Sequence, residues 1–426
     1  MRQRWLWGIV GGAGALTHFG TALLRLNTFF PYPKLKDFAA FYAGAWAVRL
    51  GVSPYGWSPE FLETLQVETS LSGHLPVPYN PPIWLWLLQP LFFSFPVATI
   101  VWVLLVLAFV AWSAIALAQI AGYEEWRHRA VVFLLILTFG PTFLDLTLGQ
   151  NSFVLLAVAL VIGQALRAEV KDFRLSTVLA SGLAVGARLF PIIWLGALPL
   201  LRRWRLFIFA ILVVLLVLGL PFLLAPTGSH DYWLEILPRR VLSASEQVGV
   251  DDQSLVAWLE RLGRPQIFQV PGLSVTQQHT ITWSPPWSFT PQIIRLVGYS
   301  LLGLLALITL TILLRAGPAQ AEGAFYLLVL FGLLLFPHTE RYNHVLLLPA
   351  MTWLWGRGEQ GRNLVILAYF LAGLSRLTHL WAILLPAPWG PLASGFGLYA
   401  VLLLGGGMIV FLWPSRPTLA TCEGGK

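Results

Sequence analysis

The polar residues best suited to chemistry lie between long apolar stretches of the chain. Asp37 begins a short segment rich in aromatic residues. A carboxylate at a helix start satisfies free N–H groups, but one held at a membrane surface is also placed to act as a general base, a role worth about 10²–10⁴ in rate. Tyr79 opens Tyr-Asn-Pro-Pro at 79–82, where the prolines suit a helix start. We take Asp37 as the candidate base and Tyr79 as a candidate substrate contact.

A polar turn, Asp145-Leu-Thr-Leu-Gly-Gln-Asn151, separates two apolar stretches. Two interpretations fit this turn. Gln150 and Asn151 either cap the helix that follows or, together with Asp145, present hydrogen-bond donors and acceptors to sugar hydroxyls. All three are therefore candidate substrate-binding residues.

Cations form the last group of candidates. Arg188 lies inside an apolar segment, directly before Leu-Phe-Pro at 189–191. It either snorkels to the interface, pairs with Asp145 or Glu340, or binds an anion such as a phosphate, for which Arg offers two parallel donors. A later apolar stretch is followed by a second polar cluster, which contains His338, Arg341, Tyr342 and His344. We expect Arg188, His338 and Arg341 to bind phosphate and Tyr342 to contact the substrate.

The composition is that of a polytopic membrane protein. The chain has 426 residues, of which 57% are hydrophobic and 11% charged, with a mean hydropathy of +0.73; a soluble domain is about 25% charged. Several stretches of about 20 residues with almost no charge are long enough to cross a bilayer. The net charge of +8 comes from short basic clusters between these stretches, which is typical of positive-inside topology. We therefore expect membrane lipids, and no nucleic acid, as partners.

Cofactor motifs are missing from the sequence. It contains no Walker loop, no Rossmann glycine pattern, no His-x-x-x-His and no cysteine cluster, which argues against an ATP-driven pump. The single cysteine, Cys422, excludes an internal disulfide. We expect neither a cofactor nor a metal.

The elements that position these residues are predicted to form one all-α membrane domain over 1–426, with about 12 spans and both termini in the cytoplasm. Two long extracytoplasmic loops are expected at about 31–82 and 226–291. Asp37–Leu50 is predicted to be an interfacial helix, because its large apolar residues fall mainly on one side. The segment 175–201 is expected to break near Arg188. The clearest spans are predicted at about 97–120, 131–146, 150–166, 206–225, 292–314, 323–337, 343–356, 363–385 and 391–413.

The order of these motifs resembles that of a known family. An acidic residue in a first external loop, Tyr-x-Pro-Pro, Gly-Gln-Asn, a basic residue before Phe-Pro and a late His/Tyr cluster are similar to glycosyltransferase family 87. These membrane mannosyltransferases use polyprenyl-phosphate-mannose and have the type-C glycosyltransferase fold. The resemblance implies a plasma-membrane enzyme whose active site faces the extracytoplasmic side, with a polyprenyl-phosphate-linked sugar as donor and a glycolipid or glycan as acceptor.

The resemblance also implies roles for particular residues. Asp37 matches the family's catalytic carboxylate, Gln150-Asn151 its Gly-Gln-Asn turn, Arg188 its basic residue before Phe-Pro, and His338 its late histidine. Asp251-Asp-Gln-Ser254 resembles an Asn-Gln-Ser element in which Asp252 replaces the first residue, so Asp252 and Gln253 are further substrate-binding candidates. The implied reaction is an inverting transfer of the sugar.

Three other classes of membrane protein remain as alternatives. A lipid-linked oligosaccharide flippase or other transporter is expected to show polar residues along a path through the membrane, whereas here they gather near one face. An O-antigen ligase or polymerase is expected to carry more cations in its large loop, for a second phosphate. A non-enzymatic scaffold has no evident need for Arg188, which costs about 2.5–3.5 kcal/mol on insertion scales.

Overall fold

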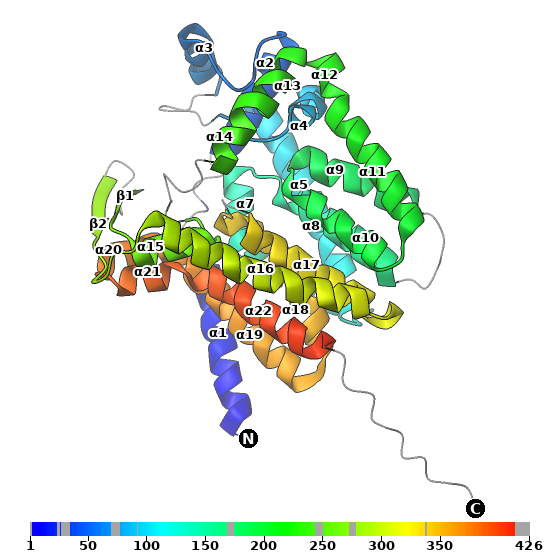
Figure 1. Ribbon diagram of the computed structural model, residues 1–426, viewed down its shortest axis with the longest axis vertical. Coiled ribbons are helices and arrows are strands. Elements are labelled where there is room, and N and C mark those ends of the chain that lie inside the picture. Colours follow the sequence, from blue (N-terminus) through cyan, green and yellow to red (C-terminus); the bar gives the residue numbers. More distant parts are fainter. Residues whose placement is uncertain are drawn as a thin grey trace, which may run out of the picture.

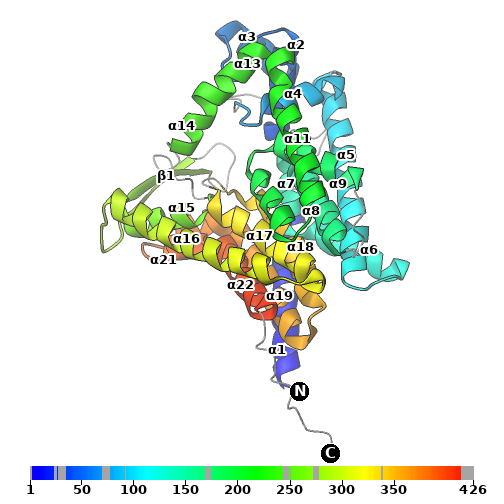
Figure 2. The same ribbon diagram turned by 45° about the vertical axis from the view of Figure 1, so that its right-hand side comes forward.

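The computed structural model describes residues 2–23, 26, 35–69, 77–91, 93–167, 174–242, 249, 251–271, 278–336 and 339–413. Helices make up most of it (Figure 1). The first part of the chain forms α1 (Arg2–Leu23), α2 (Lys36–Arg49), α3 (Pro59–Thr69), α4 (Pro82–Leu87) and α5 (Phe95–Ile120). Figure 2 shows α5 running from α4 down to α6, so it joins the two ends of the helical body.

Helix α2 confirms the predicted helix at Asp37–Leu50. It is not an interfacial helix with one apolar side, as was expected. Ten of its fourteen residues are buried, because it packs against α4, α5 and α7. Four small residues of α2 allow the neighbouring helices to approach closely. These buried residues are Ala39, Ala40, Ala43 and Ala47. The helix is therefore part of the protein interior, which gives Asp37 a fixed position.

The predicted span at 131–146 is a bent pair of helices rather than one straight helix. Helix α6 (Trp126–Thr138) and α7 (Gly140–Leu148) meet at an angle of 62°. Pro141 lies in the first turn of α7, where it lacks an N–H to continue the ladder of α6 and disfavours helix in the residue before it. The bend brings the end of α7 back towards α2.

The central helices carry the polar turn and the break at Arg188. Helix α8 (Ser152–Arg167) is buried along thirteen of its sixteen residues and packs against α5, α9 and α17. The predicted break is confirmed, because α9 (Leu175–Ala187) ends directly before Arg188 and a 3₁₀ segment, η3 (Phe190–Gly196), follows. The chain continues through α10 (Ala197–Leu200), α11 (Trp204–Gly219) and α12 (Pro221–Leu224).

The region predicted as a long loop at about 226–291 contains regular structure in its described residues. It begins with α13 (Pro226–Asp231), a π-helical turn (Tyr232–Ile236) and α14 (Leu237–Leu242), and continues with α15 (Leu255–Gly263). Strands β1 (Gln266–Pro271) and β2 (Gln278–Trp283) then form an antiparallel hairpin in which Gln266 pairs with Trp283. The hairpin is an exception to the all-α prediction, which the rest of the described chain supports.

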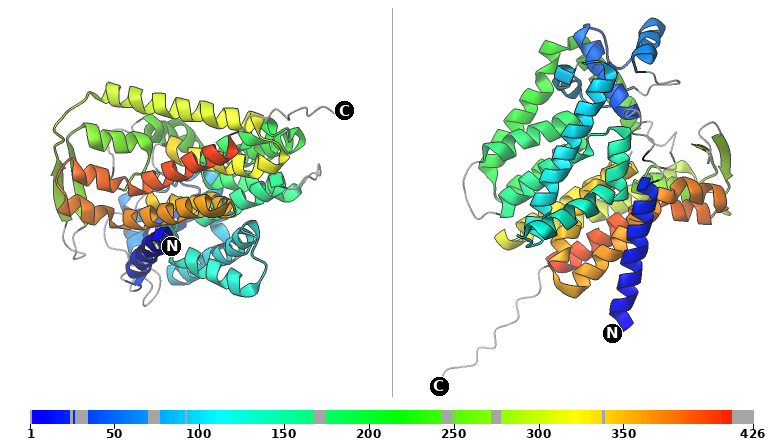
Figure 3. Two further views of the ribbon diagram at one scale, coloured as in Figure 1. Left: turned by 90° about the horizontal axis from the view of Figure 1, so that it is seen from below. Right: turned by 180° about the vertical axis from the view of Figure 1, so that it is seen from behind.

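The last part of the chain forms a row of helices. Figure 3 shows α16, α22 and α19 side by side, with α1 against α19. The elements are α16 (Pro291–Arg315), α17 (Ala321–Leu335), the 3₁₀ segment η6 (Arg341–Leu347), α18 (Leu348–Trp355), α19 (Gly358–Leu374), α20 (Thr378–Leu384), α21 (Trp389–Ser394) and α22 (Phe396–Leu412).

Within the described residues, five helical stretches are long and apolar enough to cross a membrane, or six if α6 and α7 count as one span. The five are Phe95–Ile120, Trp204–Leu224, Pro291–Arg315, Pro318–Leu335 and Gly358–Leu384. Shorter apolar helices, including α8, α9 and α22, lie among them. The chain is a mainly helical membrane protein, and the figure of about 12 spans stays a prediction.

Candidate active site

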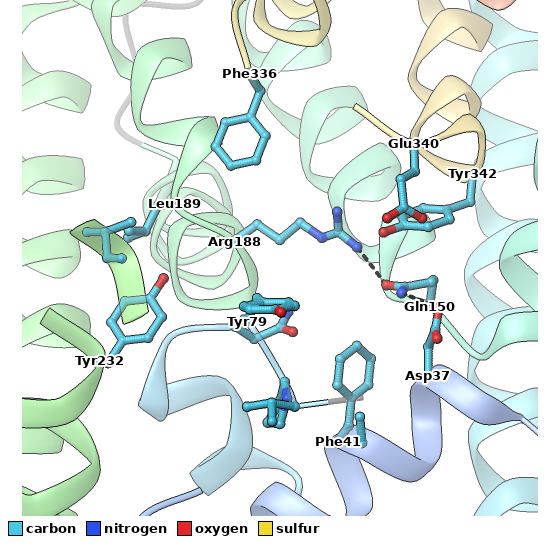
Figure 4. Close-up of a pocket in the computed structure, with 15 residues that line it drawn as sticks. Asp37, Phe41, Tyr79, Gln150, Arg188, Leu189, Tyr232, Phe336, Glu340 and Tyr342 are labelled. Carbon is cyan, nitrogen blue, oxygen red and sulfur yellow. Dashed lines mark hydrogen bonds between the residues drawn. The ribbon is translucent and has the colours of Figure 1, made fainter. Parts of the chain in front are cut away.

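A cavity of about 200 Å³ lies where α2, the turn before α8, the break at Arg188 and the segment before η6 meet. Figure 4 shows Asp37, Gln150 and Arg188 pointing towards one another at its polar side, with Phe41, Leu189 and Phe336 supplying apolar surface. The described residues that line it are Asp37, Ala40, Phe41, Val77, Pro78, Tyr79, Asn80, Gln150, Arg188, Leu189, Tyr232, Leu237, Phe336, Glu340 and Tyr342. The sequence therefore brings a carboxylate and a guanidinium from distant segments to one cavity.

A single amide joins these two charged groups. Gln150 Nε2 donates to Asp37 Oδ2 at 2.7 Å, and Gln150 Oε1 accepts from Arg188 Nη2 at 2.6 Å. Hydrogen bonds in which one partner is ionised are the stronger kind. The two bonds fix the orientation of the amide, because its nitrogen faces the carboxylate and its oxygen faces the cation. Gln150 thus holds Asp37 and Arg188 at a set separation.

The close approach of the polar turn to α2 depends on Gly149. This residue has φ +75°, a left-handed conformation that glycine adopts without strain. A Cβ at this position would lie 2.6 Å from Phe38 Cβ and 2.8 Å from Leu35 Cβ, so only glycine lets the turn reach the start of α2. The turn closes through Asp145, whose main-chain carbonyl accepts from the N–H groups of Gly149 and Gln150.

Asp145 itself lies behind the cavity rather than in its wall. Its side chain is fully buried, and its Oδ1 accepts from the backbone N–H of Ser152 at 3.1 Å, at the start of α8. This is a helix-capping contact. Asn151 is also fully buried and is not a lining residue, but it accepts a hydrogen bond from Arg188.

Arg188 is held by neutral amides. Its backbone is extended, with φ −155° and ψ 146°, directly after α9, and this turns the side chain into the cavity (Figure 4). Nε donates to Asn151 Oδ1 and Nη1 to Asn343 Oδ1, both at 3.0 Å, and the guanidinium lies 5.2 Å from the Tyr342 ring centroid. Because amide oxygens do not neutralise the guanidinium, its charge remains available to an anion in the cavity.

Two further asparagines contribute to this arrangement and were not predicted. Asn343 anchors Arg188, and it lies 155 positions away in the chain. Asn80 Nδ2 donates to the Ala187 carbonyl at 2.7 Å, and so ties the Tyr-Asn-Pro-Pro segment to the end of α9. Asn80 stood inside a motif that the sequence singled out, whereas Asn343 is signalled only by its position beside Tyr342. Tyr79 is where it was expected, half exposed at the cavity.

Burial acts on the candidate base. It raises the pKa of Asp37 above its ordinary value, against the opposing effects of the Gln150 hydrogen bond and the charges of Lys36 and Arg188. A carboxylate with a raised pKa is a stronger base while it remains ionised. The environment of Asp37 therefore suits proton abstraction.

Arg341 lies outside the cavity, although its neighbour Tyr342 lines it. Arg341 is buried and pairs with Asp251 Oδ1 at 2.6 Å, while His379 Nε2 lies 2.9 Å from Asp251 Oδ2. Burial acts to raise the pKa of Asp251, but the charges of Arg341 and His379 outweigh it and hold that pKa well below its ordinary value. This partly buried cluster joins the segment at 249–254 to η6 and α20, so the geometry gives Arg341 a structural partner and places it outside the cavity lining.

Asp252 and Gln253 also lie away from the cavity. Both are buried; Asp252 forms a β-bridge with Glu340, and Gln253 Nε2 donates to the Ser394 carbonyl at 2.9 Å. Their contacts attach this segment to its neighbours. His338 lies outside the described residues, and so its expected role stays a prediction.

Within the part of the chain that the structure describes, no group of three or more His, Cys, Asp and Glu side chains is placed to hold a metal ion. The cavity offers Asp37 and Glu340 as carboxylates. The other polar side chains among its described lining residues are one guanidinium, that of Arg188, and several amide and phenol groups.

Comparison with known proteins assigns the chain to a family. No curated protein and no solved structure matches it. The family model of glycosyltransferase family 87 matches residues 79–337, more than half of the chain. The match includes Gln150, Asn151 and Arg188, and Asp37 lies before its start. The chain therefore belongs to glycosyltransferase family 87 and is a membrane glycosyltransferase.

Proposed function

We propose that this enzyme moves a hexose, with mannose the first candidate, from a polyprenyl-phosphate donor to a glycolipid or glycan acceptor. The transfer takes place at the extracytoplasmic side of the plasma membrane, with inversion at the anomeric carbon. The observation that carries the proposal is the Asp37–Gln150–Arg188 chain at one cavity. A base and an anion-binding group are the two functions that transfer from a sugar phosphate requires.

In the proposed reaction, Asp37 accepts the proton of an acceptor hydroxyl, and the hydroxyl oxygen attacks the anomeric carbon. A new carbon–oxygen bond forms as the bond from that carbon to the phosphate oxygen breaks. The bonding electron pair leaves with the polyprenyl phosphate, whose diester becomes a monoester. Arg188 stabilises the charge that develops on this phosphate, as preorganised donors do in other transfer reactions.

The charge of the cavity favours a donor with one phosphate. Among the described lining residues, Arg188 is the one cation, and it stands opposite Asp37 and Glu340. A diphosphate-linked donor, as in the ligase alternative, brings more negative charge to a site that already holds two carboxylates. A single guanidinium matches a single phosphate group, to which it can donate two parallel hydrogen bonds.

The test is transfer by the purified protein in lipid nanodiscs. Polyprenyl-phosphate-mannose and a polyprenyl-diphosphate-linked oligosaccharide are each offered with a panel of glycolipid acceptors, and products are identified by mass spectrometry and their anomeric configuration by NMR. We expect product from the monophosphate donor alone, with inverted configuration. Product from the diphosphate donor alone would support the ligase alternative, and donor movement across the bilayer of proteoliposomes without product would support a flippase.

A further inference from the structure

A second cavity, of about 390 Å³, forms a groove between α1, α5, α6, α18 and α19. It shares no described lining residue with the cavity at Asp37. The groove contains Leu117 and Ala121 at the far end of α5, and Figure 2 shows that this end of α5 lies well away from α4 and α2. The groove therefore belongs to a different part of the molecule from the candidate active site.

The walls of the groove are apolar and partly uncovered. Val131 and Leu135 on α6 are 54% and 48% exposed, and Leu348 and Met351 of α18 also line the groove. Gly11 and Ala15 of α1 and Val365 and Ile366 of α19 complete the lining. Exposed apolar side chains along a groove in the membrane pack against the hydrocarbon chains of lipids.

The depth of the groove corresponds to one leaflet of a bilayer. On α6 the lining runs from His128 to Ile136, which at 1.5 Å per residue is about 12 Å. The hydrocarbon core of a bilayer is about 30 Å thick, so the groove accepts a chain from one leaflet. This length fits a phospholipid acyl chain better than a long polyprenyl chain, which passes the midplane.

The mouth of the groove is polar and basic. Trp355 Nε1 donates to the Tyr123 hydroxyl at 3.0 Å, and the His128 ring stacks on Tyr123 at 5.2 Å. The Arg362 guanidinium lies 5.9 Å from the Trp355 ring centroid. The Glu125 carboxylate also lies here, 3.7 Å from the His128 ring, so the mouth carries an acidic side chain as well.

Arg129 supplies an independent indication of an anion. It follows His128, a lining residue, in the first turn of α6 and lies at the edge of the lining face, although it is not itself a lining residue. Its Nε is buried and has no hydrogen-bond partner among the described residues. A buried N–H group without an acceptor costs free energy. A phosphate oxygen at the groove mouth would accept its hydrogen bond.

We propose that this groove binds an anionic phospholipid, with one acyl chain along α6 and α18 and the headgroup phosphate between Arg129 and Arg362. The proposal does not depend on the reaction at Asp37. The bound lipid fills the space between α1 and α6 and adds to the contacts that α1 already makes with α19. It therefore stabilises the folded protein as a ligand does, in proportion to its affinity.

The experiment measures lipid binding by the delipidated full-length protein in detergent, with phosphatidylglycerol and phosphatidylcholine of identical acyl chains. Native mass spectrometry gives the affinity, and thermal unfolding gives the stabilisation. We expect phosphatidylglycerol to bind roughly tenfold more tightly or better, because each nearby arginine favours an anionic headgroup. Arg129→Gln should remove most of this preference. Equal affinity for the two lipids would overturn the proposal.

Location is tested separately. Ala15→Trp places a large ring in the groove and should abolish tight binding, whereas the matched control Leu215→Trp, on an exposed position of α11, should not. Should the Ala15→Trp protein fail to fold, phosphatidylglycerol with a photoreactive group on its acyl chain is used on the parent protein. Crosslinks on α6 and α18 peptides support the proposal. Crosslinks confined to other helices, or full binding by folded Ala15→Trp, would contradict it.

Discussion

Replacement of Arg188 by alanine should weaken donor binding strongly. The side chain places a guanidinium at the cavity that is held in position by three amide oxygens, so its charge is not neutralised by these contacts. Hydrogen bonds to charged groups contribute about 1.5–3 kcal/mol. At about 1.4 kcal/mol for each factor of ten, the affinity for polyprenyl-phosphate-mannose should fall roughly 10- to 150-fold.

The lysine variant tests whether geometry matters as well as charge. Arg188→Lys keeps a positive charge but loses the planar fork, so it should recover part of the affinity and not all of it. Arg205→Ala, at an exposed position in the first turn of α11, is the matched control and should bind donor like the parent.

Stability has to be measured with affinity in the same preparations. Alanine at 188 leaves the amide oxygens of Gln150, Asn151 and Asn343 without this donor, and unsatisfied buried acceptors cost about 1–3 kcal/mol each. Donor affinity is therefore measured on the folded fraction, by direct binding in nanodiscs after size-exclusion chromatography. A folded Arg188→Ala protein whose donor affinity lies within twofold of the parent would refute the phosphate-binding role.

Three further changes test the surroundings of the site. Gln150→Ala removes a hydrogen bond that lowers the pKa of Asp37, so the acid limb of the rate–pH profile should move to higher pH; a rate loss without that movement would leave Gln150 a packing role only. Gly149→Ala puts a Cβ 2.6 Å from a side-chain carbon of α2 at φ +75°, and thermal unfolding should show a loss of about 1–3 kcal/mol. Asp251→Asn leaves buried Arg341 without its counter-charge and should cost about 2 kcal/mol near neutral pH, less than for a fully buried pair because Asp251 is 36% exposed. Since the folded-state pKa of Asp251 is depressed, its contribution is present above the ordinary pKa of 3.8 and is lost as pH falls through the folded-state pKa. The unfolding free energy of the asparagine variant should therefore fall less steeply with acid than that of the parent, and equal slopes would count against the pair.

Local chemistry in the sequence predicted the parts of the site that a few adjacent residues determine. The helix after Asp37 was predicted from its apolar residues, and the break before Phe190-Pro191 from the proline and the charge at 188. The Gly-Gln-Asn turn was recognised as polar. The close packing of this turn against α2 was not predicted, because it depends on the space beside Gly149.

Long-range pairing could not be predicted in this way. Arg341 and Tyr342 are neighbours in η6, yet Tyr342 faces the cavity while Arg341 pairs with Asp251. The rotation of the short 3₁₀ segment about its own axis decides which of two adjacent side chains faces the cavity. The sequence does not specify that rotation. Similarly, the sequence predicted one span where the structure has two helices, α6 and α7, with a bend between them.

The measurement that most directly tests the proposed chemistry is turnover by Asp37→Asn. The amide keeps the shape of the carboxylate, and its oxygen can still accept the hydrogen bond from Gln150 Nε2, but it cannot act as a base. The matched control is Glu63→Gln, at an exposed position of α3. We predict a folded protein with near-parental donor affinity and a turnover lower by about 10²-fold or more, while the control keeps parental turnover. A turnover of Asp37→Asn within a few-fold of the parent would contradict the role of Asp37 as the base.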